Sequence, residues 1–537
     1  MYNVLVADAI SDTGLQALYE HPNFKVDKYP GLAPADLKNI IKNYDALIVR
    51  SQTQVTEDIL EAAVRLRVVA RAGVGVDNID VKAATKKGIL VINAPGANTI
   101  AAAEHTMAMM LSMARNVPRA HQSASAGKWE RNAFKGVELY EKTIGVVGMG
   151  KIGAAVAKRS KSFEMKVLGY DPYLTEERAA QMGITKASLE DIARESDFIT
   201  VHTPLTNDTR GLVNDEYIAA CKEGVRFINC ARGGIIDEAA LLRGLQSGKV
   251  AGAALDVFET EPSTNLELLS HPNVIVTPHL GASTVEAQEK VAHEVSEEII
   301  DIFETQAIRH AVNMPQVSGE TQKKLQPFIE LGEQMGTLAI QLLKKAPEKV
   351  EINYYGELAK EDTSMLTRIM VKGVLAPHLG DSVNLINALH LLKEQGVASN
   401  IAKNPASKGF ESYVELTLYN GDEKANIGAT VLNGYGARIV KMNDYRVDVR
   451  PEHYLLYIKH HDIPGMIGRV GSILGNYDIN IGTMQVGRAV VGGEAIMVLT
   501  LDKKVDDAVI QALTSIQGLK AAQFLELPND ENIPVHN

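Results

Sequence analysis

Cysteine is rare in this chain: its 537 residues include only two, Cys221 and Cys230. Two cysteines cannot build a disulfide framework or, by themselves, a structural zinc site, so we expect reduced thiols and a protein of the cytoplasm. No apolar run reaches the roughly 18 residues that a membrane-spanning helix needs. The opening residues MYNVLVAD are typical of a strand rather than of a signal peptide. We therefore expect neither a secreted disulfide-rich protein nor one that spans a membrane.

Positive charge is also in short supply. Lysine and arginine number 55 against 66 aspartates and glutamates, which gives a formal net charge of −11. Without a basic stripe the chain has little with which to neutralise a phosphate backbone, so a nucleic-acid partner is disfavoured. Any anionic ligand must then be held by a few well-placed arginines. The length predicts three or four domains, because one hydrophobic core rarely extends beyond about 250–300 residues.

A dinucleotide-binding pattern spans residues 143–171. A β-branched run ends in Gly148, Gly150 and Gly153, and a helix of small residues follows at once. In such a turn the first glycine permits the bend, the second lets a pyrophosphate approach bare backbone, and the third lets helix and strand pack closely. Glycines alone are weak evidence, since ordinary turns use them too. A second apolar run ends at Asp171, however, where a carboxylate accepts hydrogen bonds from a ribose 2′-hydroxyl, so we predict NAD rather than NADP.

The first 98 residues alternate short β-branched runs with helical stretches, which predicts a small parallel α/β domain. Its expected strands are residues 2–6, 46–49, 68–70 and 89–92. In open α/β sheets ligands lie beyond the carboxyl ends of the strands. There the sequence places Arg50 and Arg71, the latter beside the glycine-rich loop 73–75. Two guanidinium groups next to free backbone N–H groups suit a small molecule with a phosphate and a carboxylate, although surface arginines in ordinary ion pairs would look the same.

The pattern after residue 98 predicts a long helix over 99–124 and then a nucleotide-binding sheet of about six parallel strands. The only tryptophan, Trp129, follows that helix, and we interpret it as a packing or interface anchor. Beyond residue 171 the expected strands are residues 198–201, 225–230, 251–257 and 274–277. Polar or ionisable residues follow each of them. Four strands therefore bring such residues to the edge where the nucleotide lies.

Hydride transfer from an alcohol carbon needs a base, a partner that holds the base, and a fixed cation for the substrate oxygens. His279 is the candidate base, Glu261 can hold its other ring nitrogen, and Arg232 can fork onto a carboxylate and the adjacent oxygen. A histidine at a strand end is by itself more often structural, and we leave His105 and His202 outside the chemistry on that ground. The carboxylates show no spacing typical of metal ligands, so we expect no metal.

The motifs taken together resemble a known family. GMGKIG, HTPL, NCARGGIID, ALDVFETEP and TPHLGAST, in this order, resemble the D-isomer-specific 2-hydroxyacid dehydrogenases, and the likeness covers residues 1 to about 313. VRSQTQVT and RAGVGVDNID resemble in particular the branch of that family that acts on a phosphorylated hydroxy acid. The resemblance implies catalytic roles for Arg232, Glu261 and His279. It also implies an architecture in which the nucleotide domain is inserted into the substrate domain.

The resemblance extends to individual ligand contacts. Together with the glycine turn, it implies cofactor contacts at Gly148, Gly150, Lys151, Ile152, Gly153, Asp171, Thr203, Cys230, Ala231, Arg232, Asp256, His279 and Gly281. Asp256 would contact the nicotinamide amide. Substrate contacts would fall on Arg50, Arg71, Val74, Gly75 and Asn98. Val74 stands where close relatives can carry threonine, so we count only its backbone N–H.

The implied fold class is α/β. A Rossmann-type doubly wound parallel sheet, residues 99–281, would be inserted in a smaller flavodoxin-like substrate domain made of residues 1–98 and 282–313. Two chain crossings make a hinge, and we hypothesise that NAD and substrate close the cleft between the two domains. Residues 317–450 resemble an α+β intervening domain, similar to an allosteric substrate-binding domain.

Residues 452–527 resemble a βαββαβ ferredoxin-like ACT regulatory domain, with DIPG before its first helix and NINI after it. In that family an amino acid binds between two paired domains, which would place L-serine contacts on Asp462 and Asn480. The alternative is an ACT domain that serves only assembly.

The function that the resemblance implies is NAD-dependent oxidation of 3-phospho-D-glycerate to 3-phosphohydroxypyruvate. This reaction is the first step of L-serine biosynthesis. The resemblance also implies feedback inhibition by L-serine and assembly as a homotetramer. One alternative is a glycerate/glyoxylate or 2-oxoglutarate reductase with the same machinery. An alternative of another class is an NAD-sensing corepressor, which the ACT domain argues against.

Overall fold

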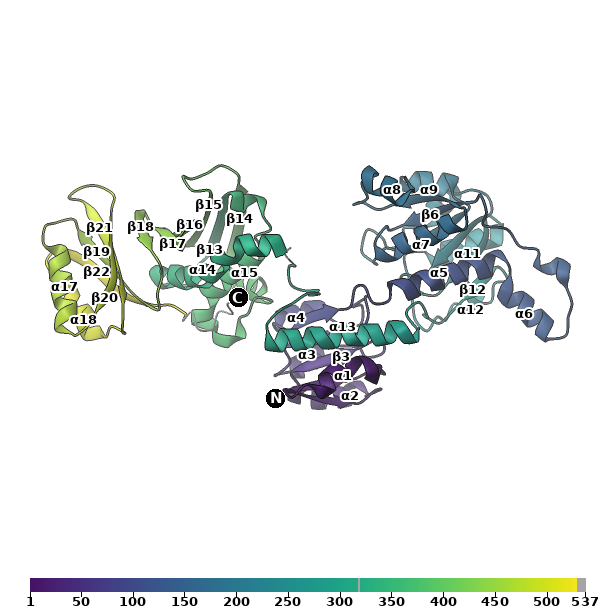
Figure 1. Cartoon of the computed structure of the whole chain (residues 1–537), viewed down its shortest axis with the longest axis horizontal. Coiled ribbons are helices and arrows are strands. Elements are labelled where there is room, and N and C mark those ends of the chain that lie inside the picture. Colours follow the sequence, from purple (N-terminus) through teal and green to yellow (C-terminus); the bar gives the residue numbers. More distant parts are fainter. Residues whose placement is uncertain (317–318, 529–537) are drawn as a thin grey trace.

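The computed structural model describes residues 1–316 and 319–528, so residue 317, the first of the expected intervening domain, lies outside the described residues. Figure 1 shows the nucleotide-binding unit at one end of the long axis, the N-terminal unit below the centre, and the C-terminal units toward the other end. Within the described ranges no helix combines the length and the apolar character needed to cross a membrane.

The N-terminal sheet has five parallel strands in the order β2-β1-β3-β4-β5. They are β1 (Tyr2–Val6), β2 (Phe24–Lys28), β3 (Ala46–Val49), β4 (Val68–Arg71) and β5 (Leu90–Asn93). Both faces are covered by helices, and the central strands are accordingly continuous apolar runs. The pattern of β-branched runs does not predict β2, because FKVDK alternates apolar and charged residues at a half-exposed edge.

Helices α1 (Asp12–Glu20) and α13 (Val285–Glu304) cover one face of this sheet, although they are far apart in the sequence. They cross closely at Gly14, where a Cβ would lie 2.4 Å from that of Ala292, and Ser296 Oγ donates to the carbonyl of Gly14 at 3.1 Å. The chain therefore returns to its first unit after the nucleotide-binding unit, as the sequence analysis expected. Helices α2 (Pro34–Ile40), α3 (Glu57–Ala62) and α4 (Val81–Lys86) complete this unit.

The nucleotide-binding sheet has seven parallel strands in the order β12-β11-β10-β9-β6-β7-β8. They are β6 (Thr143–Val147), β7 (Lys166–Tyr170), β8 (Thr185–Lys186), β9 (Phe198–Val201), β10 (Val225–Asn229), β11 (Val250–Leu255) and β12 (Val274–Val276). The expected number was about six. The additional strand, β8, consists of two exposed residues, and no apolar pattern in the sequence predicts it.

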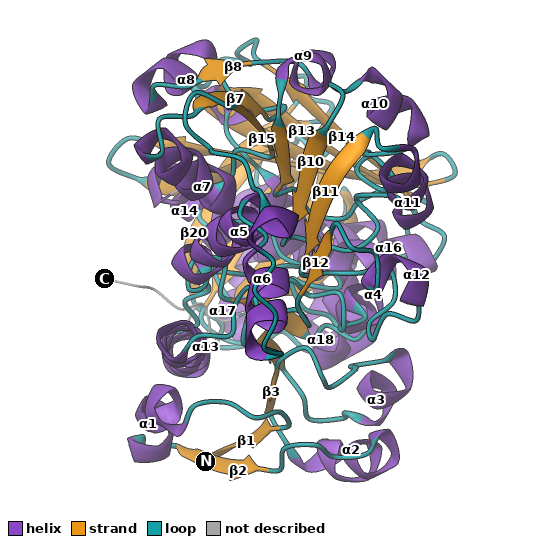
Figure 2. Cartoon of the chain, turned by 90° about the vertical axis from the view of Figure 1, so that its right-hand side faces the viewer, coloured by secondary structure: helices purple, strands orange, loops and turns teal. Residues whose placement is uncertain are grey.

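Helices cover both faces of the nucleotide-binding sheet, and Figure 2 shows α5 and α7 on one side and α10 and α11 on the other. Those on the first side are α5 (Thr99–Ala114) and α7 (Lys151–Ser162). Those on the second side are α9 (Leu189–Glu195), α10 (Asp215–Ala220) and α11 (Glu238–Ser247). Two short helices, α8 (Glu176–Met182) and α12 (Leu266–Leu269), lie beside β8 and β12.

The prediction of a single long helix over residues 99–124 is wrong. The chain forms α5 (Thr99–Ala114) and then α6 (Val117–Ser125), because Asn116 adopts a left-handed φ of 54° and Pro118 follows it. α6 has no buried residue, and with the turn Arg131–Phe134 it forms an arm at the edge of the unit (Figure 1). Trp129 lies on this arm with a relative exposure of 84%, so it does not pack within its own chain.

The C-terminal third contains two further sheets. The first is mixed, in the order β14-β13-β15-β16-β17-β18, and α14 (Gly319–Leu343) and α15 (Ser364–Leu379) pack beside it. Its strands are β13 (Lys349–Gly356), β14 (Ala398–Asn404), β15 (Ser412–Asn420), β16 (Glu423–Leu432), β17 (Gly436–Met442) and β18 (Tyr445–Val449). Helix α16 (Ala388–Glu394) contacts α4 of the N-terminal unit.

The last sheet is antiparallel, in the order β20-β21-β19-β22. Its elements are β19 (Tyr454–His461), α17 (Met466–Asn476), β20 (Ile481–Arg488), β21 (Glu494–Leu501), α18 (Asp507–Thr514) and β22 (Leu519–Glu526). This is the predicted βαββαβ order. Leu455, Val498 and Leu525 of this sheet share one hydrophobic cluster with Leu338 and Val350 of the preceding unit, so the two C-terminal units pack against each other.

Candidate active site

A cleft of about 520 Å³ lies between the N-terminal and nucleotide-binding units, at the carboxyl ends of their parallel strands. Both units contribute to its walls, as expected for ligands of open α/β sheets. The predicted site residues among the lining are Arg50, Arg71, Val74, Gly75, Asn98, Ile152, Thr203, Cys230, Ala231, Arg232, His279 and Gly281. One cleft therefore brings together all of the predicted substrate contacts and most of the predicted cofactor contacts.

The β6–α7 turn has the geometry that its glycines predict. Gly148 has a φ of 95°, which a side chain would strain, and a Cβ on Gly153 would lie 1.9 Å from the carbonyl oxygen of Gly148. A Cβ on Gly150, in contrast, would meet open space. Asp171 follows β7 and accepts a hydrogen bond from the backbone N–H of Met149 at 2.9 Å. The second glycine thus leaves room for a ligand, while the first and third are required by the fold itself.

Two buried side-chain oxygens of the predicted contacts have no hydrogen-bond partner among the described residues. They are Asn98 Oδ1 and Thr203 Oγ1. A buried polar atom without a partner is costly, and such atoms in a cleft are normally completed by a ligand. Lys151 begins α7, a helix whose free N–H groups suit a pyrophosphate. The chemistry of these donors and acceptors fits a dinucleotide.

Three arginines approach the cleft from two units. Arg71 is mostly buried, and burial first, then the charges of Arg232 and Arg50, lowers its pKa to about 10. Gly73 and Gly75 make room for two of the guanidinium groups, because a Cβ on either glycine would lie 1.8 Å from a nitrogen of Arg71 or Arg232. The glycines of the loop between β4 and α4 therefore leave the space that these two guanidinium groups occupy.

His279 and Glu261 form a direct pair. Nδ1 of His279 lies 2.8 Å from Oε2 of Glu261, whose Oε1 accepts the backbone N–H of Phe258 at 3.1 Å. Burial raises the pKa of the Glu261 carboxyl, but the hydrogen bond and charge of His279 outweigh it, and the net shift is downward. The carboxylate is thus ionised at neutral pH and leaves the second ring nitrogen of His279 free to exchange a proton.

Arg232 lies in a loop that is fixed from both sides. The side chain of Asn229, at the end of β10, donates to the carbonyl of Arg232 at 2.8 Å and accepts from Ala231 N at 3.0 Å. Nε of Arg232 contacts Asp77 Oδ2 of the N-terminal unit at 3.0 Å. The arginine is therefore held at the boundary between the two units.

Sequence reasoning missed several residues that build the cleft. Asp8 is 1% exposed and accepts from Thr53 Oγ1 at 2.7 Å, while Asn78 Nδ2 donates to the carbonyls of Arg50 and Thr53 at 2.6 Å. The available signals were the position of Asp8 just after β1, in VAD, and that of Asn78 in the loop before α4, in VDNID. His202, which the sequence analysis left outside the chemistry, lines the cleft, and burial lowers its pKa to about 4. It is neutral at physiological pH.

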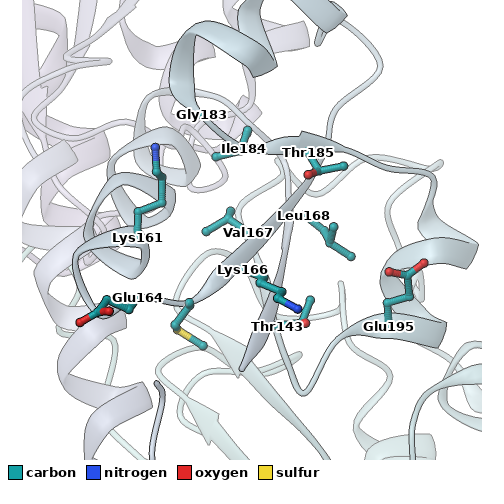
Figure 3. Close-up of a pocket in the computed structure, with 11 residues that line it drawn as sticks. Thr143, Lys161, Glu164, Lys166, Val167, Leu168, Gly183, Ile184, Thr185 and Glu195 are labelled. Carbon is teal, nitrogen blue, oxygen red and sulfur yellow. The ribbon is translucent and has the colours of Figure 1, made fainter. Parts of the chain in front are cut away.

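A second hollow lies near the strand β7, and Figure 3 shows its lining residues. Lys161 and Glu164 lie at one side and Glu195 at the other, without converging on a common point. Lys161 Nζ donates to the carbonyl of Met182 at 3.0 Å. None of the predicted site residues lines this hollow, so the interdomain cleft is the stronger candidate for an active site.

Comparison with known proteins agrees with this geometry. Residues 107–281 match the NAD binding domain of D-isomer specific 2-hydroxyacid dehydrogenases, residues 324–443 match the D-3-phosphoglycerate dehydrogenase intervening domain, and residues 454–518 match the ACT domain. D-3-phosphoglycerate dehydrogenase of Bacillus subtilis is 44% identical over 98% of this chain and 100% of its own length. D-3-phosphoglycerate dehydrogenase of Methanocaldococcus jannaschii is 43% identical over 98% of this chain and 100% of its own length. The chain belongs to the D-3-phosphoglycerate dehydrogenase family.

Solved structures match a little over half of this D-3-phosphoglycerate dehydrogenase family member. The TT0316 protein from Thermus thermophilus covers 58% of this chain and 99% of its own, with 33% identity and a TM-score of 0.53. D-lactate dehydrogenase from Aquifex aeolicus, complexed with NAD and lactic acid, matches 58% of this chain and 100% of its own chain, with 31% identity and a TM-score of 0.53. The predicted fold class, the oxidoreductase class and the NAD cofactor are confirmed.

The two expected effector residues lie apart in this family member. Asp462 accepts Gly492 N at 3.1 Å and Arg488 Nη1 at 3.3 Å, beyond one end of β20. Asn480 precedes the other end of β20 and donates to Asp502 Oδ2 at 2.8 Å. An eight-residue strand is about 25 Å long at roughly 3.3 Å per residue. Asp462 and Asn480 of one chain therefore cannot both contact the same small molecule.

Proposed function

We propose that this chain oxidises 3-phospho-D-glycerate to 3-phosphohydroxypyruvate with NAD, the entry step of L-serine biosynthesis. The observation that carries the proposal is that Arg50, Arg71 and Arg232 line the same cleft as His279, whose ring is paired with Glu261. A phosphate carries roughly two negative charges at neutral pH and the carboxylate carries one more. Three guanidinium groups, of which Arg232 is already paired with Asp77, suit that charge better than they suit a substrate that carries a carboxylate alone.

The proposed roles follow the geometry. Arg232 holds the substrate carboxylate and the C2 oxygen, and His279 takes the hydroxyl proton through the nitrogen that Glu261 leaves free. Glu261 stabilises the imidazolium that forms. Bound NAD would supply the acceptor for the hydride of C2. In the reverse direction the same imidazolium returns its proton to the carbonyl oxygen.

Cofactor and substrate contacts are proposed on the residues that the cleft and its turn gather. Gly150 would let the pyrophosphate approach the start of α7, in the turn that Gly148 and Gly153 shape, and Asp171 would bind the ribose hydroxyls. Lys151, Ile152, Thr203, Cys230, Ala231, Asp256 and Gly281 would complete the cofactor site. Arg50, Arg71, Asn98 and the backbone of Val74 and Gly75 would hold the substrate.

The test is NADH formation from 3-phospho-D-glycerate by the wild type and by an Arg50→Ala variant, with D-glycerate and D-lactate as comparison substrates. We expect turnover of the phosphorylated acid and a rise in its KM of about ten-fold or more in the variant, because a charge-assisted contact contributes roughly 1.5–3 kcal/mol. Preference for D-glycerate, or an unchanged KM, would contradict the phosphate assignment. Similar rates with 2-oxoglutarate and NADH would favour the reductase alternative.

The proposed domain division is 1–98 with 282–313, 99–281, 317–450 and 452–527. Two crossings near Asn98 and Gly281 support closure of the cleft around bound ligands. Small-angle scattering with both ligands should give a smaller radius of gyration than without them. An unchanged radius would count against closure.

We further propose a homotetramer of the cytoplasm. Support for self-association comes from the arm, where Trp129 is 84% exposed and Val117, at the start of α6, is 52% exposed. Apolar side chains gathered on a protruding element are typical of a protein interface. Sedimentation of Trp129→Ala should show a smaller species than the wild type, whereas Tyr435→Ala, at an exposed tyrosine of another unit, should not.

L-serine is the proposed effector, bound between two ACT domains by Asp462 of one chain and Asn480 of its partner. Neither an Asp462→Ala nor an Asn480→Ala homo-oligomer should respond to millimolar L-serine. Mixed oligomers should recover part of the inhibition, because every pair of unlike chains retains one site with both wild-type residues. If the rate of the wild type does not change with L-serine, L-serine is not the effector. If the mixed oligomers do not respond, the site is not shared between two chains.

A further inference from the structure

The proposed catalytic base lies on a turn with an unusual backbone. His279 has a φ of 55°, in the left-handed region that residues other than glycine seldom adopt. Such a conformation persists only where its surroundings fix it. The backbone N–H of His279 donates to the carbonyl of Asp256 at 2.9 Å, and so ties the turn to the end of β11.

The side chain of Asp256 binds the two residues that follow the base. Its Oδ1 accepts the N–H of Leu280 at 2.7 Å and the hydroxyl of Thr277 at 2.6 Å, and its Oδ2 accepts the N–H of Gly281 at 2.8 Å. The residue is 0% exposed. This one buried carboxylate therefore shapes the turn that presents His279.

A histidine from a different element completes the set. Nε2 of His105, on α5, lies 3.1 Å from Asp256 Oδ1 and 3.1 Å from Thr277 Oγ1. Thr277 gives its proton to Asp256, so both atoms that face Nε2 are acceptors and His105 is the donor. Burial works to raise the pKa of Asp256, but the hydrogen bonds from His105 and Thr277 hold it below its ordinary value.

We propose that His105 is a positioning residue: it holds the buried Asp256 carboxylate, which in turn fixes the strained turn that carries His279. His105 lies 19% exposed in the helix that begins where the chain crosses between units, so it links that crossing to the catalytic turn. Its effect on turnover rests on the proposed function of His279, whereas its effect on the turn does not.

The first test uses the ligand-free protein. Amide hydrogen exchange of a peptide spanning residues 276–283 should be about ten-fold faster or more in His105→Leu, because the N–H groups of Leu280 and Gly281 end on Asp256. His105→Gln retains a donor at similar reach and should exchange nearly as slowly as the wild type. His293→Leu, at an exposed histidine of α13, is the matched control and should leave this peptide unchanged.

Wild-type exchange in His105→Leu would overturn the proposal. Equal acceleration in His105→Leu and His105→Gln would overturn it too, because the size of the imidazole rather than its hydrogen bond would then be what matters. This readout needs no substrate, so it stands apart from the proposed function, which the wild-type assay with 3-phospho-D-glycerate tests by itself.

The second test is kinetic. His105→Leu should lower kcat by about ten- to a hundred-fold, since a small displacement of a catalytic group has effects of that order. The KM for the hydroxy acid should remain within about two-fold, and His105→Gln should recover most of the rate. The double variant His105→Leu/Asp256→Asn should be no slower than Asp256→Asn alone. Fully additive losses would show that His105 does not act through Asp256.

Discussion

The arginines of the cleft carry positive charge that the protein balances only in part, through the Arg232–Asp77 ion pair. The pKa of Arg71 falls to about 10, first because of burial and then because Arg232 and Arg50 lie near it. At neutral pH it is nevertheless protonated. The unfolded chain would hold this proton more tightly, so the destabilisation is present below about pH 10 and fades only between that pH and the ordinary value of 12.5. A bound phosphate would relieve it.

Replacing Arg71 should therefore separate stability from function. We expect Arg71→Met to raise the melting temperature of the ligand-free protein by about 2–4 °C, while kcat/KM for phosphoglycerate falls by about 10²-fold. The measurements are thermal unfolding at pH 7 and steady-state kinetics. Arg226→Met, at a half-buried arginine whose pKa burial also lowers, is the control and should keep kcat/KM. A lower melting temperature for Arg71→Met would argue against stored charge repulsion.

The His279–Glu261 pair gives a second prediction at this scale. Glu261→Gln keeps the shape of the side chain but not the charge that stabilises the imidazolium, so kcat should fall by roughly 10²- to 10⁴-fold. Because its pKa is lowered, Glu261 stays ionised as pH falls toward its ordinary value of 4.5, and the acid limb of the wild-type rate profile should not arise from it. Rates from pH 5 to 9 check both points. Glu259→Gln in the same loop should be near wild type.

At the scale of the elements, the β6–α7 turn separates the glycines that the fold needs from the one that a ligand needs. Gly153→Ala should destabilise the protein by about 1–3 kcal/mol, since its Cβ would overlap the carbonyl of Gly148. Gly150→Ala should fold normally, because its Cβ meets open space, but it should weaken NADH binding by ten-fold or more as the methyl group meets the pyrophosphate. Denaturant unfolding and NADH fluorescence titration measure the two effects. Equal effects of the two variants on binding and stability would contradict this division of roles.

At the scale of the whole molecule, a small contact joins the C-terminal units to the substrate side of the cleft. Ile386, in the loop before α16, is 8% exposed and belongs to the hydrophobic cluster of the N-terminal unit, and Asn384 Nδ2 donates to the carbonyl of Gly88 at 2.8 Å. Gly88 follows α4, and that helix begins just after the loop that follows Arg71 and bears Asp77. This contact therefore connects the proposed effector units with the loop that holds the arginines.

Ile386→Asp should break this contact, because a buried charge without a partner is strongly unfavourable. We expect a larger radius of gyration, weaker inhibition by L-serine, and a basal kcat within about two-fold of the wild type. Ile401→Asp, at a position of β14 that is 46% exposed, is the control and should change none of the three. Unchanged inhibition together with an expanded molecule would mean that the signal does not pass through this loop.

The sequence by itself determined those features that depend on near neighbours in the chain. Apolar runs predicted nearly all strands of the two parallel sheets, and the glycine turn with Asp171 predicted NAD. Short, exposed or alternating elements such as β2 and β8 escaped, because their stability comes from pairing with a neighbouring strand rather than from their own composition. The break at Asn116 was missed although Pro118, in the first turn of α6, is a local signal that a new helix begins there.

Only the tertiary structure decided which side chains meet. His105 and Asp256 are far apart in sequence, as are Asp77 and Arg232, and no local pattern sets their distances. The same holds for Asp462 and Asn480, which are close in the chain yet lie at opposite ends of β20. Local composition selects helices, strands and turns, whereas the packing of whole sheets and helices fixes contacts over long separations. The residue types of this active site are thus fixed by the sequence, and the support behind its catalytic turn by the folded chain.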